Sequence, residues 1–192
     1  MNLIRIIPVL AAGIVLTVTS SVAGNALNGM NPNAPPEVAH MGKLVGRWST
    51  TEESLKPDGS GWQPSTSADW DFHWEYNGHG IRDLYVSPPV EQKVDDESTR
   101  TRGVNLRVYN PAEKKWVMTW LTTAATPPSG FTAVSDAETI VMLSDKPGAN
   151  GFHSRITFFD IQDNSFEWKM EWSKDQKQWL EVHRIHGVRK AE

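Results

Sequence analysis

The stretch DWDFHWEYNGHGIRDLYVS, residues 69–87, predicts two antiparallel strands joined by a tight turn. In its first half, large aromatic side chains alternate with charged residues and one histidine, as in a strand with one buried face. The aromatic face carries Trp70, Phe72, Trp74 and Tyr76, and the polar face carries Asp69, Asp71, His73 and Glu75. Asn77-Gly78 then tolerates the positive φ angles of a hairpin turn, and Ile81–Ser87 returns.

The rest of the chain follows the same pattern outward from this hairpin. Short β-prone runs, separated by turns, lie at residues 47–55, 104–109, 116–122, 131–135, 138–144, 153–161, 166–173 and 179–188. An open sheet of about ten strands would curl or split, so consecutive strands with short turns favour an up-and-down barrel. We therefore predict an all-β protein, with a single antiparallel barrel over residues 37–192. A short helix at its start is predicted from the apolar stripe of Val38, Met41, Leu44 and Val45, ended by Gly46.

The first 26 residues have the composition of a secretory signal peptide. Arg5 precedes an apolar run over 6–18, and small residues stand before Gly24 and before Leu27. The run is too short to span a bilayer. We expect cleavage after Ala23 or Ala26, export to the periplasm or the medium, and a flexible Asn/Pro/Gly linker over 27–36.

Composition limits the classes of partner. The 192 residues carry a net charge of −4, with no basic stripe, so neither nucleic acid nor an anionic membrane surface is an expected partner. The chain contains no cysteine, which excludes disulfides and a lipid anchor at the cleavage site. Nine tryptophans provide large apolar area for a core or for a binding cavity.

Four segments resemble a known family when taken in order. MGKLVGRW (41–48) resembles the helix-then-Gly-x-Trp entry of calycin-like barrels, the lipocalin and fatty-acid-binding superfamily. NGHGIRDLYVSPP (77–89), RGVNLRVYNPAEKKWVMTWL (102–121) and SFEWKMEWSKDQKQW (165–179) resemble an uncharacterised bacterial group of calycin-like (lipocalin-like) fold. The resemblance implies a barrel with a ligand cavity and supplies no activity, because one fold serves many functions.

The hairpin over 107–120 carries Trp116, Met118 and Trp120 on one face. Both faces of its second strand are largely uncharged, so alternation alone does not orient it. The resemblance and the neighbouring Arg107-x-Tyr109 favour an inward Trp face. Trp120 is then predicted to line the cavity, and Trp116 to lie at the rim or to act as a plug.

Polar groups among aromatic neighbours are typical of cavities that fix the orientation of a ligand. The candidate ligand-binding residues are Trp74, Asp83, Tyr85, Arg107, Tyr109, Trp120, Arg155, Trp168 and His183. Arg107 is suited either to holding a ligand carboxylate or to a structural ion pair with Asp83. No metal or other cofactor is expected, since the polar face of 69–75 lies opposite four aromatics and is predicted to face solvent.

We therefore expect an exported binding protein for a small, partly apolar molecule, and favour a non-enzymatic role. One alternative is a cavity enzyme of lyase, isomerase or hydrolase type that uses Asp83, Arg107 and His183 for acid–base chemistry. Another is an interaction module with surface tryptophans such as Trp62 exposed as a platform. The sequence predicts neither the ligand nor the oligomeric state.

Overall fold

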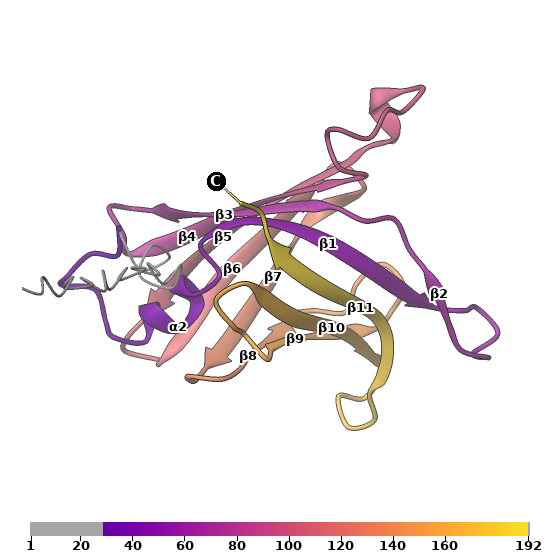
Figure 1. Ribbon diagram of the computed structural model, residues 1–192. Coiled ribbons are helices and arrows are strands. Elements are labelled where there is room, and N and C mark those ends of the chain that lie inside the picture. Colours follow the sequence, from indigo (N-terminus) through magenta and orange to yellow (C-terminus); the bar gives the residue numbers. More distant parts are fainter. Residues whose placement is uncertain (1–28, 192) are drawn as a thin grey trace, which may run out of the picture.

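The computed structural model describes residues 29–191, which form a closed antiparallel β-barrel (Figure 1). Each barrel strand pairs with the next one in sequence, and the last strand pairs with the first to close the sheet. The ten barrel strands are β1 (Gly46–Leu55), β3 (Asp69–Glu75), β4 (Gly80–Ser87), β5 (Thr101–Asn110), β6 (Lys115–Thr122), β7 (Ala125–Ser135), β8 (Ile140–Ser144), β9 (His153–Phe159), β10 (Ser165–Ser173) and β11 (Leu180–Arg189). The predicted all-β antiparallel barrel is therefore confirmed, together with all ten of its strands.

Several local predictions differ from the structure. An additional strand, β2 (Trp62–Pro64), pairs only with β1 and was not predicted, because three residues are too few to show alternation. The expected helix is reduced to one turn, α2 (Val38–Gly42), and a 3₁₀ turn, η1 (Glu97–Thr99), precedes β5. Tyr76 does not continue the aromatic face of β3. It lies in the turn with φ of 51° and is 56% exposed.

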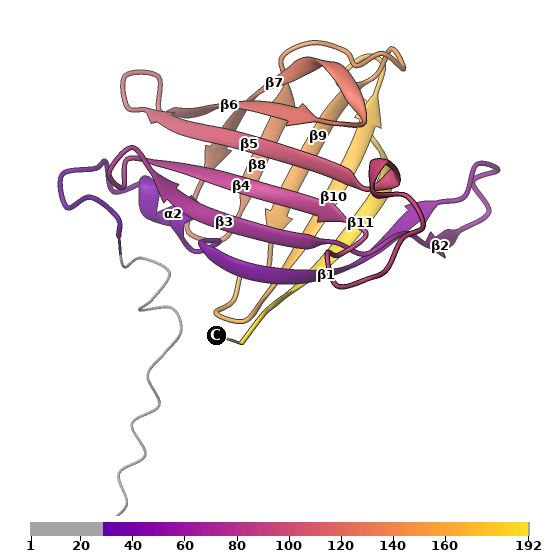
Figure 2. The same ribbon diagram turned by 90° about the horizontal axis from the view of Figure 1, so that it is seen from above.

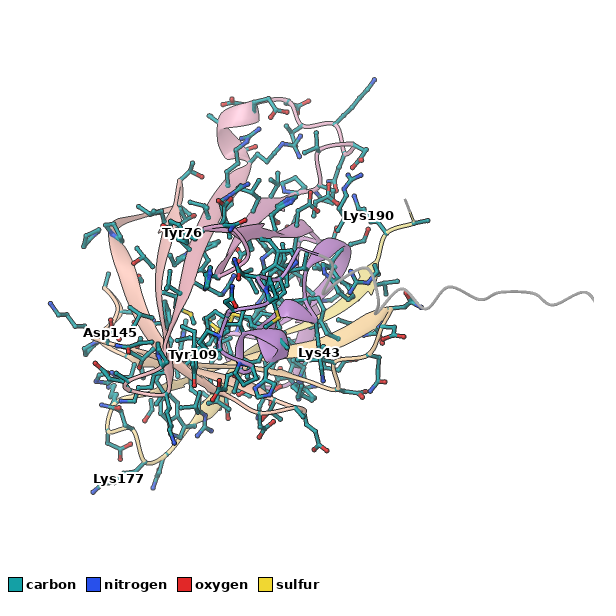
Figure 3. All side chains as sticks on the ribbon, turned by 90° about the vertical axis from the view of Figure 1, so that its left-hand side faces the viewer. Lys43, Tyr76, Tyr109, Asp145, Lys177 and Lys190 are labelled. Atoms are coloured by element: carbon teal, nitrogen blue, oxygen red, sulfur yellow. The ribbon has the colours of Figure 1, made fainter. Side chains whose placement is uncertain are left out.

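One end of the barrel is filled by side chains. The turn α2 lies across this end, and β2 projects from the opposite end (Figure 2). Seen from the α2 end, Lys43 and Tyr109 lie beside the helical turn (Figure 3). The core here is close to fully buried and includes Val38, Met41, Leu44, Trp48, Phe72, Ile81, Trp116, Ile140 and Phe166. Trp48 also donates from Nε1 to the Leu44 carbonyl at 2.7 Å, which ties β1 to the segment that covers the end.

The segment before α2 is anchored to the same end. Asn31 donates from its backbone N–H to the Gly78 carbonyl at 3.1 Å and from Nδ2 to the Asn77 carbonyl at 3.0 Å. The described part of the expected linker, 29–36, therefore lies against the β3–β4 turn. The expected signal peptide, 1–26, lies outside the described residues. Within residues 29–191, no helix is long and apolar enough to cross a membrane.

The outer face of β5 to β8 is unusually apolar. Val108 of β5 lies opposite Val117 of β6, and Val134 of β7 lies opposite Val141 of β8. The large apolar side chains exposed on these strands are Val108, Val117, Leu121, Val134 and Leu143. We call this surface the outer apolar face. Exposed apolar surfaces can bind apolar molecules, so experiments have to distinguish binding to this face from binding inside the barrel.

Candidate ligand-binding site

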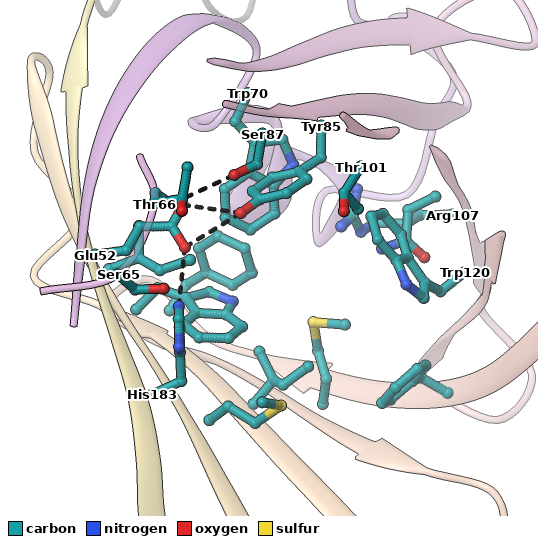
Figure 4. Close-up of a pocket in the computed structure, with 18 residues that line it drawn as sticks. Glu52, Ser65, Thr66, Trp70, Tyr85, Ser87, Thr101, Arg107, Trp120 and His183 are labelled. Carbon is teal, nitrogen blue, oxygen red and sulfur yellow. Dashed lines mark hydrogen bonds and ion pairs between the residues drawn. The ribbon is translucent and has the colours of Figure 1, made fainter. Parts of the chain in front are cut away.

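The barrel contains a cavity of about 490 Å³, and Figure 4 shows the side chains that line it. Its wall is largely apolar and includes Trp70, Trp120, Phe131, Met142, Phe158 and Trp168. Ser87 ends β4 and Thr101 begins β5, and both line the cavity at the strand ends away from α2. A ten-stranded barrel is wide enough to hold a small molecule as well as its own side chains, and this volume is within the usual range for ligand pockets.

Alternation along each strand places these side chains inward. On β6, Trp116, Met118 and Trp120 point inward, as predicted, but at different heights along the barrel. Trp116 is fully buried at the closed end, whereas Trp120 lines the cavity. Gly103 of β5 makes room for the Trp120 indole, since a Cβ at this glycine would lie 2.0 Å from Cη2 of the ring.

One side of the cavity is organised around Glu52 of β1. Its Oε1 accepts from the Thr50 hydroxyl at 2.7 Å and from the Tyr85 hydroxyl at 3.0 Å, and its Oε2 lies 2.9 Å from His183 Nε2. An ionised carboxylate only accepts hydrogen bonds, so the His183 proton in this contact is assigned to Nε2. Pairing of β1 with β11 brings Glu52 and His183 together across the point where the barrel closes.

Tyr85 remains a hydrogen-bond donor in this network. Burial, and then the Glu52 carboxylate, raise the pKa of Tyr85 above its ordinary value. Both causes disfavour the phenolate, because it would be a second negative charge in a partly desolvated site. The phenol is therefore expected to stay neutral at neutral and mildly alkaline pH.

Across the cavity, Arg107 of β5 and Asp83 of β4 form a buried ion pair. Their side chains are 1% and 0% exposed. Burial lowers the pKa of Arg107, but a guanidinium keeps its proton in proteins and Asp83 supplies the counter-charge. With its side-chain amide turned so that both polar atoms are satisfied, Asn105 accepts from Arg107 Nη2 at 3.1 Å and donates to the Thr119 carbonyl at 3.1 Å.

The nine candidate residues predicted from sequence fall into three groups. Five of them line the cavity: Tyr85, Arg107, Trp120, Trp168 and His183. Asp83 does not line the cavity. It forms an ion pair with Arg107, which is the structural pairing considered above for these two residues. The remaining three lie elsewhere.

Trp74 and Tyr109 lie at the closed end. Trp74 is next to Gly29, and Tyr109 packs edge-on against Trp116 with ring centroids 5.5 Å apart. Arg155 alternates with the cavity residue Ile156 and therefore points outward. There it donates to both carboxylate oxygens of Glu171, each at 2.8 Å. These three residues therefore do not line the cavity.

Glu52 is the principal site residue that the sequence analysis missed. A signal for it was present, since Trp48, Thr50 and Glu52 share one face of the first strand. A carboxylate on the same face as the buried Trp48 indicates a buried, hydrogen-bonded acid.

Two alternatives to a binding protein can be compared with this geometry. The acid–base set of Asp83, Arg107 and His183 is not assembled at the cavity, because Asp83 is fully buried against Arg107 while His183 contacts Glu52. At the proposed surface platform, the guanidinium carbon of Arg184 lies over the Trp62 ring, 3.8 Å from its centroid. Among residues 29–191, no three or more His, Asp or Glu side chains converge as a metal site would require.

Comparison with known proteins places the chain among β-barrels. It is similar to Rv2717c from M. tuberculosis, with 10% identity, a TM-score of 0.56, and coverage of 83% of this chain and 100% of the other. It is also similar to the S-type phycobiliprotein lyase CPES from Guillardia theta, with 13% identity, a TM-score of 0.49, and coverage of 78% and 90%. A DUF3598 family protein of unknown function from Nostoc punctiforme has 10% identity, a TM-score of 0.49, and coverage of 78% and 48%.

These similarities concern the fold alone, because the identities are very low. No family model matches the chain, and no curated protein sequence matches it. The class that fold and cavity define is a closed antiparallel barrel with an internal ligand-sized space.

Proposed function

We propose that this protein binds a small, partly apolar organic molecule inside its barrel. The observation that carries the proposal is the cavity of about 490 Å³. A structural barrel would fill this space with side chains, as the closed end does around Trp48 and Trp116. An apolar wall with a few hydrogen-bonding groups on opposite sides is the usual construction of a site for a small organic ligand.

N-Phenyl-1-naphthylamine, an uncharged fluorescent probe, is expected to bind the protein with a dissociation constant near the micromolar range, roughly −8 kcal/mol. The naphthalene and phenyl rings bury against Trp70, Trp120 and Trp168, so probe emission should rise and tryptophan emission should fall. The measurement is a fluorescence titration of the wild-type protein at constant protein concentration.

A cavity-blocking variant and its outward-facing neighbour give a matched control. Ile156→Trp places an indole into the empty space and should weaken probe binding by at least about tenfold, or 1.4 kcal/mol. Thr157→Trp adds the same side chain to the outer surface of β9 and should leave binding unchanged. Equal affinity of the probe for the two variants would exclude the cavity as the binding site.

We also propose that the protein is exported, on the strength of the basic and apolar segment at its N-terminus. N-terminal sequencing of protein recovered outside the cytoplasm should begin at Gly24 or Leu27. A recovered chain that starts at Met1 would contradict cleavage at either position.

A further inference from the structure

Most of the hydrogen-bonding capacity of the cavity carboxylate is already used. Glu52 is 6% exposed, and its two oxygens are engaged by the hydroxyls of Thr50 and Tyr85 and by the imidazole of His183. A carboxylate has about four lone-pair sites, and these three side chains supply one donor proton each, with the Tyr85 hydroxyl in reach of both oxygens. A ligand N–H or O–H would therefore find at most about one free site on this buried carboxylate. The negative charge of Glu52 still acts on a ligand through space.

That charge is left unbalanced in the cavity when His183 is neutral. Among the described residues, the acidic and basic side chains that line the cavity are Glu52, Arg107 and His183. The positive charge of Arg107 is compensated by Asp83, with which it is buried. With His183 in its neutral form, one negative charge remains on the cavity wall.

Aromatic rings surround the same region. The Tyr85 ring lies edge-on to Trp70 with centroids 5.7 Å apart, and to Trp120 with centroids 6.3 Å apart. Trp168 lies 6.3 Å from Trp70 and 5.8 Å from the His183 ring, measured between centroids. The faces of such rings attract cations, and aromatic sites recognise quaternary ammonium groups in this way.

We propose that the cavity selects an organic cation whose charge lies on a nitrogen without N–H bonds, attached to an apolar ring body, and that it disfavours organic anions. The inference rests on the proposed ligand-binding function and adds the charge class of the ligand. A quaternary ammonium needs no hydrogen-bond acceptor, so it leaves the Glu52 network intact. It gains from both the carboxylate field and the ring faces.

Three naphthalenes of similar size test this preference by displacing N-phenyl-1-naphthylamine at pH 8. They are 2-naphthyltrimethylammonium, the uncharged isostere 2-tert-butylnaphthalene, and 2-naphthalenesulfonate. With the wild-type protein, the ammonium should compete at least about tenfold more effectively than the sulfonate. With Glu52→Gln, this ratio should fall by at least about tenfold, while the affinity for the tert-butyl compound changes less than about twofold.

Glu53→Gln is the matched control. Glu53 is exposed on the outer face of the same strand, and its substitution removes the same charge from the protein. It should leave the ratio unchanged. A wild-type protein that binds the sulfonate as well as the ammonium would overturn the inference, and so would a ratio that Glu53→Gln lowers as much as Glu52→Gln. In both cases probe binding would still support the proposed function. Failure of the probe itself to bind wild-type protein would instead reject both the charge preference and the proposed ligand-binding function.

Discussion

Replacing Asp83 by alanine is expected to lower the free energy of unfolding by about 3–5 kcal/mol. The substitution leaves the guanidinium of Arg107, which is 1% exposed, without its counter-charge in the barrel interior. An uncompensated buried charge is far more costly than the loss of the pair itself. Urea denaturation followed by tryptophan emission measures the change, with an unchanged m-value showing that unfolding remains two-state.

The neighbouring ion pair on the outside of the same hairpin is the control. Arg82 and Glu75 are each 34% exposed, so Glu75→Ala should cost at most about 1 kcal/mol. The double variant Asp83→Leu, Arg107→Met removes both charges and should recover most of the stability lost in Asp83→Ala. A cost for Asp83→Ala no larger than that for Glu75→Ala would show that the pair is not buried as described.

Trp116→Ala and Trp120→Ala are expected to separate stability from binding. Trp116 is fully buried and donates from Nε1 to the Ser135 hydroxyl at 3.2 Å, so its truncation should cost about 3–5 kcal/mol. Trp120 borders the empty space, so its truncation should cost less and leave unfolding cooperative. It should weaken probe binding by about tenfold, or 1.4 kcal/mol. Denaturation and probe titration on the two variants measure both quantities.

The two tryptophans are matched in residue type, strand and orientation, and differ in their height along the barrel. A large loss of stability in Trp120→Ala without loss of probe binding would assign Trp120 to the packed core. Equal effects of the two substitutions on binding would mean that the probe does not sit where the cavity lies.

Alternation predicted which face of a strand points inward, and much of the site follows from that. The inward aromatic residues of 69–75 were predictable from a period of two. A period of two also placed Trp116 and Trp120 on one face, but the resemblance and the neighbouring Arg107-x-Tyr109 were needed to orient that face inward. The proximity of Asp83 and Arg107 could also be predicted from the sequence, because the two residues lie on adjacent strands.

The position of an inward side chain along the barrel axis could not be predicted from the sequence in the same way. Trp74 and Tyr109 point inward like Trp120, but they lie beside the segment that closes the barrel. Which end is closed depends on where residues 29–45 pack, a long-range feature that no strand pattern encodes. The Glu52–His183 contact likewise requires β1 to meet β11, 131 positions apart in sequence.

The location of the bound probe tests the central claim most directly. Crystals soaked with N-phenyl-1-naphthylamine should show its rings inside the barrel, between Trp70, Trp120 and Trp168, with the Glu52 network intact. The outer apolar face around Val117 and Val134 should be empty of probe. Probe bound on that face, with the barrel interior unoccupied, would contradict an internal binding site.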